Sequence, residues 1–446
     1  MDKKLYCGAA VEDITPEEFP FPRMIKGVFF GGVVDYLKVR AIAIGSGDSK
    51  YLLISFDLVA APDPEENVPR LSKRTGIPEE NILFFGTHAH AAPMVGKNRI
   101  VTRPPSLDED GAKLVEAYAN KVYSAMETAV DRAIAEMRPA KFGVGTGKSF
   151  INVNRNKDYV STEDGKRTVR CGLGFNAEGL SDKTLFTMKF EDYDGNPIAF
   201  FINYPVHAVV MHMNECCDGT MGISGDIPGV VSGYMEDMFE GAVAMWTSGS
   251  AGDQNPIMMN HLYYPDPKTG VFVGEAIKGG DAYMLKVLST RHLDDVLRTL
   301  EGVECLTDTA EISSAVDWSY TPGRDAIPVD PSNPFSESKV VTEGADPYDI
   351  RMQMLRIGDV ALLGLSGELY TSISLHLKEI SPLKNTVIVT HCSSAYSRSG
   401  YIYDDDAIER RALHHNKSRI LPGYVKDEMS RVMIGLLDKT HGGGKL

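Results

Sequence analysis

The segment NILFFGTHAHAAP, residues 81–93, places two histidines two residues apart at the end of an apolar run. The run predicts a strand that continues through His90. Side chains two residues apart on a strand point to the same side, so His88 and His90 are expected to face one site where the strand ends. Strand ends are where α/β proteins place their chemistry. On the motif alone, a pair of hydrogen-bonded surface histidines explains the segment equally well.

Outward from this segment, apolar runs bounded by turn residues predict strands, and apolar residues three or four apart predict helices. Further strands are expected at residues 37–45, 50–59, 184–192, 197–210, 242–250 and 385–394. Helices are expected at residues 108–137, 227–239, 280–300, 369–380 and 426–437. The alternation lacks strict βαβ regularity, which predicts an α/β fold with mixed β-sheets flanked by helices. Residues 328–347 are expected to form a loop, and residues 441–446 a frayed tail.

Composition narrows the class of protein. The 446 residues are 43% hydrophobic and 24% charged, which is typical of a globular chain, and no internal repeat or compositional shift divides residues 1–446. We therefore expect a single catalytic-type domain. The net charge of −15 disfavours binding to nucleic acid or to an anionic membrane. No signal peptide is recognisable, and the six scattered cysteines suit a reducing compartment, so we expect a cytoplasmic location. No apolar run reaches about 20 residues, so we expect no membrane span.

Three motifs match known patterns incompletely. GVGTGKS, residues 143–149, lacks the first glycine of a phosphate-binding loop and is not followed by a predicted helix. GLSGE and GISGD, residues 364–368 and 222–226, lack the final glycine of the serine-hydrolase turn. Nucleotide binding and a serine nucleophile are therefore disfavoured.

Polar residues follow several other predicted strands in the same way. His207 ends the apolar run INYPVH, Glu368 follows a glycine where a strand gives way to a helix, and tyrosines follow the strand before residue 391. Imidazoles with a carboxylate are zinc-type ligands, and a position left open for water makes such a site catalytic. Taken singly, Glu368 also suits a helix N-terminus, His207 a buried core histidine, and Tyr401 half-buried packing.

Several motifs, in order along nearly the whole chain, resemble the catalytic domain of the neutral/alkaline ceramidase family. These are GAAVEDITP (8–16), GTHAHAAP (86–93), NVNRN (152–156), NYPVHAVVM (203–211), SGDIPGVVSGYME (224–236), GSAGDQNP (249–256), SGELY (366–370) and SRSGYIY (397–403). The resemblance implies a ceramidase-like N-terminal-domain fold and a zinc site, with another divalent transition metal as an alternative. It implies the ligands His88, His207, Glu368 and Tyr401, with a neighbouring tyrosine as an alternative to Tyr401. It also implies that His90 and Arg155 contact substrate or developing charge.

The sequence departs from the family pattern at two places. Asn255 stands where ceramidases have a serine, and the family's immunoglobulin-like C-terminal domain and secretion signal are not recognisable. The metal ligands implied by the resemblance are all present. We therefore expect the metal site to be kept and ceramide not to be the substrate.

These residues together predict a zinc-dependent hydrolase. Zinc lowers the pKa of a bound water to about 7, His90 could transfer a proton, and Arg155 could bind a carboxylate or an oxyanion. Asp253 and Asn255 could orient ligands or water. The predicted reaction is cleavage of an amide, ester or lactone bond in a small polar molecule. Two alternatives stay open: a metal-dependent isomerase or lyase acting on a hydroxy or carbonyl metabolite, and a binding protein stabilised by a structural metal.

Overall fold

Three β-sheets form the framework of the computed structural model, which describes residues 3–23, 28–96, 108–163, 165–268, 272–276, 279–329, 338–392, 400–412 and 418–441. The first sheet has the order β6-β5-β4-β1-β7, the second β14-β12-β11-β8 and the third β18-β21-β22-β24. The first contains β1 (Leu5–Asp13), β4 (Lys38–Ser46), β5 (Ser49–Phe56), β6 (Ile82–Gly86) and β7 (Arg138–Pro139). The second contains β8 (Lys141–Lys148), β11 (Thr184–Glu191), β12 (Pro197–Tyr204) and β14 (Val243–Ser248). The third contains β18 (Ile312–Thr321), β21 (Tyr348–Ile357), β22 (Val360–Leu365) and β24 (Asn385–Val389).

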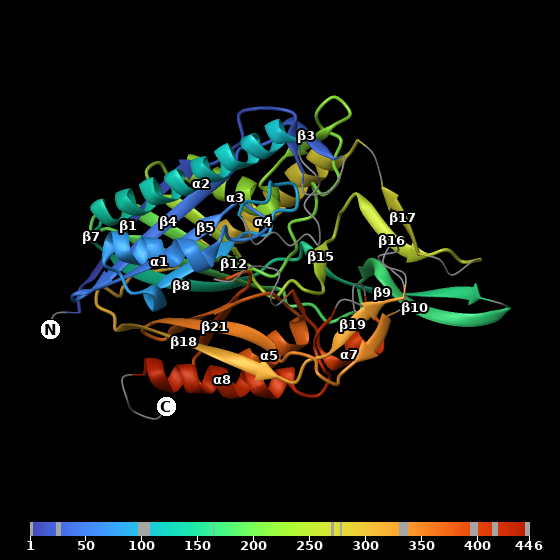
Figure 1. The fold of residues 1–446 in the computed structure, drawn as a ribbon. Coiled ribbons are helices and arrows are strands. Elements are labelled where there is room, and N and C mark those ends of the chain that lie inside the picture. Colours follow the sequence, from blue (N-terminus) through green and yellow to red (C-terminus); the bar gives the residue numbers. More distant parts are fainter. Residues whose placement is uncertain are drawn as a thin grey trace.

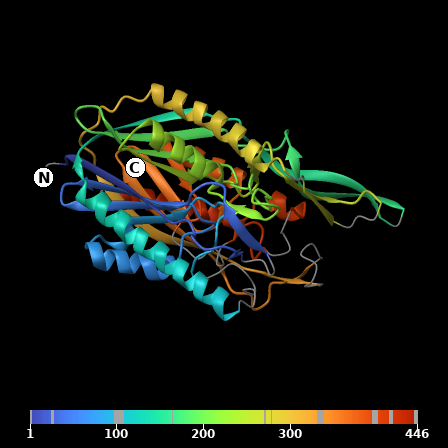
Figure 2. The ribbon, with the colours of Figure 1, turned by 90° about the horizontal axis from the view of Figure 1, so that it is seen from above.

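Helices cover the outer faces of these sheets (Figure 1). The first sheet packs against α1 (Pro64–Thr75) and α2 (Glu109–Ala135), and a short 3₁₀ turn, Glu79–Asn81, precedes β6. The second packs against α3 (Asp226–Met238) and α4 (Asp281–Glu301), and the third against α5 (Thr371–Ile380) and α8 (Val425–Thr440). Seen from above, α2 and α4 lie on opposite sides of the molecule (Figure 2). The predicted α/β class with mixed sheets and flanking helices is confirmed.

The inner faces of the three sheets share one apolar core. Leu53 of β5, Phe201 of β12 and Leu362 of β22 all belong to this cluster, and each is at most 1% exposed. Burying one such side chain contributes about 1.5–3 kcal/mol. Because all three sheets contribute to the same core, the ends of their strands are held in fixed positions relative to one another.

The helix α2 shows why the sequence pattern predicts structure well here. Its buried residues recur every three or four positions, as the apolar spacing predicts: Val115, Tyr118, Val122, Met126, Ala129 and Ala133. Asp108 caps the helix, since its carboxylate accepts a hydrogen bond of 2.8 Å from the Gly111 N–H. At the other end α2 lies so close to β1 that a Cβ on Gly8 would stand 2.2 Å from the Ala133 carbonyl oxygen.

A fourth sheet, β15-β9-β10-β16-β17, extends away from this body, and its long strands β9 and β10 form a hairpin (Figure 1). Its strands are β9 (Asn152–Glu163), β10 (Lys166–Asn176), β15 (Gln254–Pro256), β16 (His261–Pro265) and β17 (Phe272–Ala276). Smaller pieces are β2 (Phe21–Pro22), β3 (Phe29–Val33), β13 (Met221–Ile223), β19 (Asp325–Pro328), β20 (Ser338–Val341), β23 (Glu368–Leu369), β25 (Tyr401–Ile402) and α7 (Asp405–Glu409).

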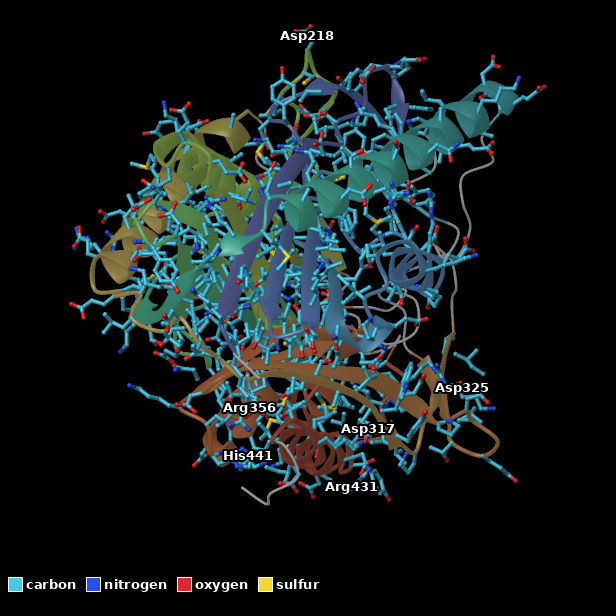
Figure 3. All side chains as sticks on the ribbon, turned by 90° about the vertical axis from the view of Figure 1, so that its left-hand side faces the viewer. Asp218, Asp317, Asp325, Arg356, Arg431 and His441 are labelled. Carbon is cyan, nitrogen blue, oxygen red and sulfur yellow. The ribbon has the colours of Figure 1, made fainter. Side chains whose placement is uncertain are left out.

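The C-terminal helix α8 is tied to the third sheet by polar contacts at its end. Lys439 forms an ion pair of 2.7 Å with Asp317 of β18, and Arg356 of β21 donates to His441 Nδ1 at 2.8 Å. Figure 3 shows Asp317, Arg356 and His441 together beside this helix. Among the helices of the described residues, none combines the length and apolarity needed to cross a membrane.

Three sequence expectations about local structure are wrong. Residues 328–347 are not simply a loop, because β19 and β20 pair as antiparallel strands. Residues 330–337, between these strands in the sequence, lie outside the described residues. Polar and proline-rich composition concealed this pair of strands. The strand predicted at residues 81–90 ends at Gly86, and the strand predicted at residues 197–210 ends at Tyr204. Both site histidines of the first segment, and His207, therefore lie in loops.

Candidate metal centre

The carboxyl ends of three parallel strand pairs meet at one place. Each main sheet contains one such pair: β5 with β6, β12 with β14, and β22 with β24. Backbone hydrogen bonds join their ends, from Gly86 N–H to the His391 oxygen (3.4 Å) and from Thr390 N–H to the Ser248 oxygen (2.9 Å). Segments that are far apart in sequence are thus brought to one point, in the position where open α/β sheets hold ligands.

His88 and His90 face the same site, but not because they share a strand. His88 has a left-handed backbone with φ of 66°, which non-glycine residues rarely adopt and which costs on the order of 1–3 kcal/mol. Its N–H donates to the Leu58 oxygen at 2.9 Å, and this bond holds the loop. The two Nε2 atoms lie 3.0 Å apart. The turn after the strand therefore brings the rings together.

His88 and His207 are anchored in the same way. Nδ1 of His88 donates to the Val59 carbonyl oxygen at 2.9 Å, and Nδ1 of His207 donates to the Ala251 oxygen at 2.5 Å. A carbonyl oxygen only accepts, so Nδ1 of each ring carries the proton and Nε2 keeps its lone pair. A backbone anchor of this kind is typical of metal-ligating histidines.

Glu368 lies between these two lone pairs. Its Oε2 is 3.0 Å from His207 Nε2 and 3.4 Å from His88 Nε2, and all three side chains are 1% exposed. Burial and the charge of Arg155 lower the pKa of His207 to about 4. Acceptor atoms this close, facing one another, suit a shared cation, so this donor set fits a divalent metal ion.

Tyr401 is placed beside Glu368 by strand pairing. In the short parallel pair of β23 and β25, Glu368 is the partner of Tyr401. The Tyr401 hydroxyl oxygen lies 3.4 Å from His207 Nε2, and burial raises the pKa of this phenol above its usual range. The residues just before it, 393–399, lie outside the described residues. A tyrosine oxygen is thus at hand as a further ligand.

His391 is a site residue that the sequence reasoning missed. Its ring stacks on that of His88 with centroids 3.8 Å apart. Among the described residues, His88, Glu368 and His391 form one of two groups that could hold a metal ion. The other group is His88, His90 and His207. His391 lies inside the strand predicted at residues 385–394, but β24 ends at Val389, so His391 follows the end of a strand as His88 and His207 do. That position was the available signal.

Arg155 and Asn255 come from the adjacent strands β9 and β15. Nη1 of Arg155 lies 3.4 Å from His207 Nε2 and 3.4 Å from Asn255 Oδ1. The side chain is 5% exposed, and its guanidinium carbon stands 5.0 Å from the centre of the Tyr401 ring. Its Nε has no hydrogen-bond partner among the described residues. A buried N–H beside the centre is therefore available to a ligand.

Asp253 supports the site rather than facing it. Its Oδ1 accepts hydrogen bonds from the Thr371 N–H (3.0 Å) and hydroxyl (2.6 Å), and its Oδ2 accepts from Asn154 at 2.9 Å. Its carbonyl oxygen accepts from the Arg155 N–H at 2.8 Å. Burial raises the pKa of its carboxyl to about 6 despite these bonds. Asp253 thus joins the start of α5, just after Glu368, to the strand that carries Arg155.

Gly252 allows this close packing. A Cβ at that position would lie 2.7 Å from the Glu368 carbonyl oxygen and 2.8 Å from the Tyr370 ring. Its N–H donates to the Leu369 oxygen at 2.9 Å. The loop that precedes Asp253 therefore runs directly against the backbone of Glu368, and a larger residue would push the two apart.

Comparison with protein-family models and with curated protein sequences found no match. Among solved structures, the chain is similar to neutral ceramidase from Pseudomonas aeruginosa, with a TM-score of 0.69 and 15% sequence identity over 99% of this chain and 74% of that one. It is also similar to a ceramidase in complex with C2, with a TM-score of 0.70 and 15% identity over 98% and 75% of the two chains. The chain therefore has a ceramidase-like fold, as the sequence motifs predicted.

Proposed function

We propose that this protein is a metal-dependent hydrolase that cleaves an amide, ester or lactone bond in a small polar substrate other than ceramide. The observation that carries the proposal is the convergence of two Nδ1-anchored histidines on one buried carboxylate, at the strand ends of a ceramidase-like fold. A cytoplasmic location and a single-domain organisation stay predictions from the sequence.

The proposed metal ligands are His88, His207, Glu368 and Tyr401. Imidazole and carboxylate donors suit Zn²⁺ best, and other divalent transition metals bind such sets as well. Zn²⁺ held there would supply Lewis acidity and a nucleophile derived from water at neutral pH. His88 is preferred to His90 because its Nδ1 is fixed by a backbone carbonyl, as in His207.

Arg155 is proposed to orient the substrate and to stabilise negative charge on its carbonyl oxygen. The Nε–H is buried and has no hydrogen-bond partner among the described residues, so a hydrogen bond to an oxyanion would be formed in a site from which water is largely excluded. Such pre-positioned donors are usually a large contribution to catalysis. Asn255 would hold the guanidinium through the 3.4 Å contact with its Oδ1.

His90 is proposed to move a proton between the attacking and leaving groups. Its Nε2 lies 3.0 Å from His88 Nε2, at the edge of the donor set, and the ring is partly exposed. Its backbone N–H donates to the Ala208 oxygen at 3.0 Å, which ties this loop to the one that carries His207. The ring can therefore reach both the centre and an incoming substrate.

The serine-to-asparagine difference at residue 255 motivates the exclusion of ceramide. Asn255 contacts Arg155 through Oδ1, and its Nδ2 lies 3.0 Å from the Met259 sulfur. The amide thus makes contacts on both sides that a serine hydroxyl is too short to make. A substrate pocket built around this pair should differ from one built around serine.

A metabolite panel analysed by mass spectrometry tests the proposed function. The purified protein, loaded with Zn²⁺, is incubated with N-acyl, ester and lactone compounds, and His88→Ala serves as the matched control. Hydrolysis adds one water and separates an acid from an amine or alcohol, except in a lactone, which opens. A product of unchanged mass would favour the isomerase alternative. No turnover of any member, with the metal bound, would favour the binding protein.

A further inference from the structure

A second buried arginine, Arg23, lies beside the site. It follows β2 and is 8% exposed. Its Nη2 donates to His212 Nδ1 (3.1 Å) and to the His90 carbonyl oxygen (3.4 Å). Its Nη1 points at two thioether sulfurs, Met213 at 2.8 Å and Met221 at 3.1 Å. No carboxylate among the described residues forms an ion pair with it, and thioethers are weak acceptors.

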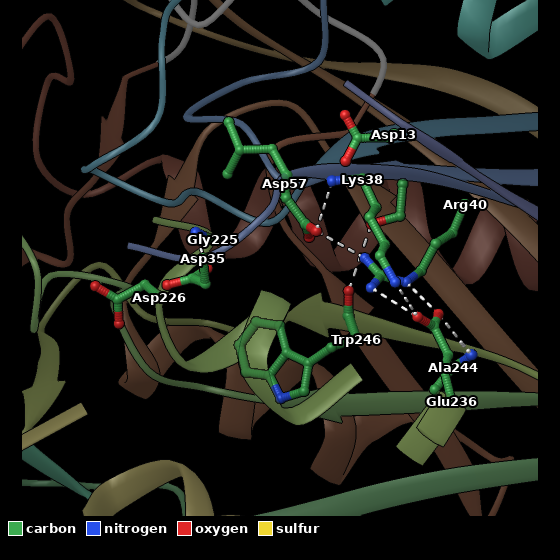
Figure 4. A network of polar contacts seen from close by, with 12 residues as sticks. Asp13, Asp35, Lys38, Arg40, Asp57, Gly225, Asp226, Glu236, Ala244 and Trp246 are labelled. Atoms are coloured by element: carbon green, nitrogen blue, oxygen red, sulfur yellow. Dashed lines mark hydrogen bonds and ion pairs between the residues drawn. The ribbon is translucent and has the colours of Figure 1, made fainter. Parts of the chain in front are cut away.

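Arg40 is a buried arginine that has carboxylate partners. Arg40 is 2% exposed, and it forms ion pairs with Asp57 at 2.7 Å and Glu236 at 2.6 Å (Figure 4). Leaving a buried charge unpaired is strongly destabilising, so pairing is the usual arrangement. Burial lowers the pKa of Arg23 to about 10, and the group still carries its charge at neutral pH. The missing partner at Arg23 therefore calls for an explanation in terms of function.

Arg23 and Arg155 border a common region of the site. The ring of His212 lies 5.4 Å from that of His90 and 4.8 Å from that of His261. Burial is the largest cause that lowers the pKa of His261 to about 4, and the charges of Arg155 and Arg23 lower it further. His261 thus lies within the field of both guanidinium groups. The row of rings from His90 to His261 therefore lies in the positive field of two buried guanidinium groups.

His212 adds a donor to this row of rings. Because Arg23 can only donate, His212 accepts at Nδ1, and its proton is therefore on Nε2. The ring is partly exposed and Met213 is 40% exposed, so the region around Arg23 reaches the surface. The flexible Met213 side chain is one that an entering group can displace.

We propose that Arg23 and His212 bind an anionic group of the substrate, so that the enzyme acts on small acids whose scissile acyl bond lies at the His88–Glu368 centre. This inference rests on the proposed hydrolase function for the position of the bond. A carboxylate suits the planar guanidinium fork best, because it accepts two parallel hydrogen bonds, and a phosphonate or phosphate offers the same oxyanion chemistry. The bound anion would supply the counter-charge that Arg23 lacks.

A matched series of ligands tests this inference by calorimetric titration of the metal-loaded, full-length protein. The probes are N-acetylglycine, its neutral amide N-acetylglycinamide, and N-acetyl-aminomethylphosphonate, each checked for integrity afterwards. The carboxylate is expected to bind at least about tenfold more tightly than the amide, as a charge-assisted hydrogen bond implies. Comparing the affinity of the phosphonate with that of the carboxylate shows which of the two anions the site binds more tightly. Equal binding of acid and amide by the wild-type protein would overturn the inference without any variant.

Variants then assign the discrimination to Arg23. Arg23→Gln is expected to abolish the preference for the acid and to leave amide binding unchanged, whereas Arg23→Lys should retain part of it. Arg70→Gln, an exposed arginine of α1 paired with Glu127, is the matched control and should change neither. A preference that survives in Arg23→Gln would contradict the inference. If that variant does not fold, His212→Gln must weaken acid binding, and an unchanged preference there would contradict it equally.

Thermal unfolding provides a second readout. Arg23→Gln removes a buried charge that has no counter-charge, so without added anion its Tm should not fall below that of the wild-type protein. A lower Tm together with an unchanged ligand preference would make Arg23 a structural residue. The two proposals can fail separately. Acid binding through Arg23 without hydrolysis of any panel member would contradict the proposed hydrolase function. Equally fast hydrolysis of acidic and neutral substrates would contradict the proposed anion site.

Discussion

Replacing Glu368 by glutamine tests the metal centre most directly. The change keeps the shape of the side chain and removes the carboxylate that lies 3.0 Å and 3.4 Å from the two histidine Nε2 atoms. Losing a residue that only supports a ligand typically weakens metal binding about 10–100-fold, and loss of a ligand itself should cost at least about 100-fold. At a free zinc concentration of ten times the wild-type Kd, occupancy should then fall from about nine-tenths to about one-tenth.

Elemental analysis after equilibration with a zinc buffer measures this occupancy. Asp253→Asn is the matched control, because it removes a buried carboxylate that bonds Thr371 and Asn154 instead of the centre. It should bind zinc more tightly than Glu368→Gln, and circular dichroism should show both variants folded. Wild-type occupancy in Glu368→Gln would refute the assignment of this carboxylate as a ligand.

Four further outcomes are expected. His90→Ala should keep the metal and lower kcat about 10²–10⁴-fold, whereas His88→Ala should lose the metal; the opposite pattern would exchange their roles. Arg155→Ala should keep the metal, lower kcat through the lost oxyanion donor and raise KM through the lost substrate contact, and steady-state kinetics in which neither constant changes would argue against both roles. A short-chain fluorescent ceramide should remain intact with the metal-loaded protein, and turnover that is lost in His88→Ala would contradict the exclusion of ceramide. Arg40→Met leaves the buried Asp57 carboxylate without its ion-pair partner, while Glu236 keeps Lys38 at 3.1 Å. The change should lower the free energy of unfolding by about 3–5 kcal/mol in urea denaturation, and a loss under about 1 kcal/mol would show that the network is not stabilising.

Local patterns in the sequence determined much of the secondary structure and the candidate residues. The apolar spacing in residues 108–137 predicted α2, because a helix buries residues every three or four positions whatever it packs against. Polar residues that follow apolar runs pointed to His207 and Glu368, because the chain leaves the core where a buried strand ends. The order of the motifs along the chain predicted the ceramidase-like fold, which the solved structures confirm.

Tertiary structure alone decided how these residues meet. The strand β6 ends at Gly86 because its partner β5 ends opposite it at Phe56, and the left-handed turn at His88 depends on a bond to the Leu58 oxygen. Neither is encoded in the propensity of residues 81–93. Likewise, Arg23 lies near His212 across 189 positions of sequence, a contact that no local pattern could reveal. Long-range pairing fixes such contacts, since each strand end is placed by the sheet it joins and not by its own residues.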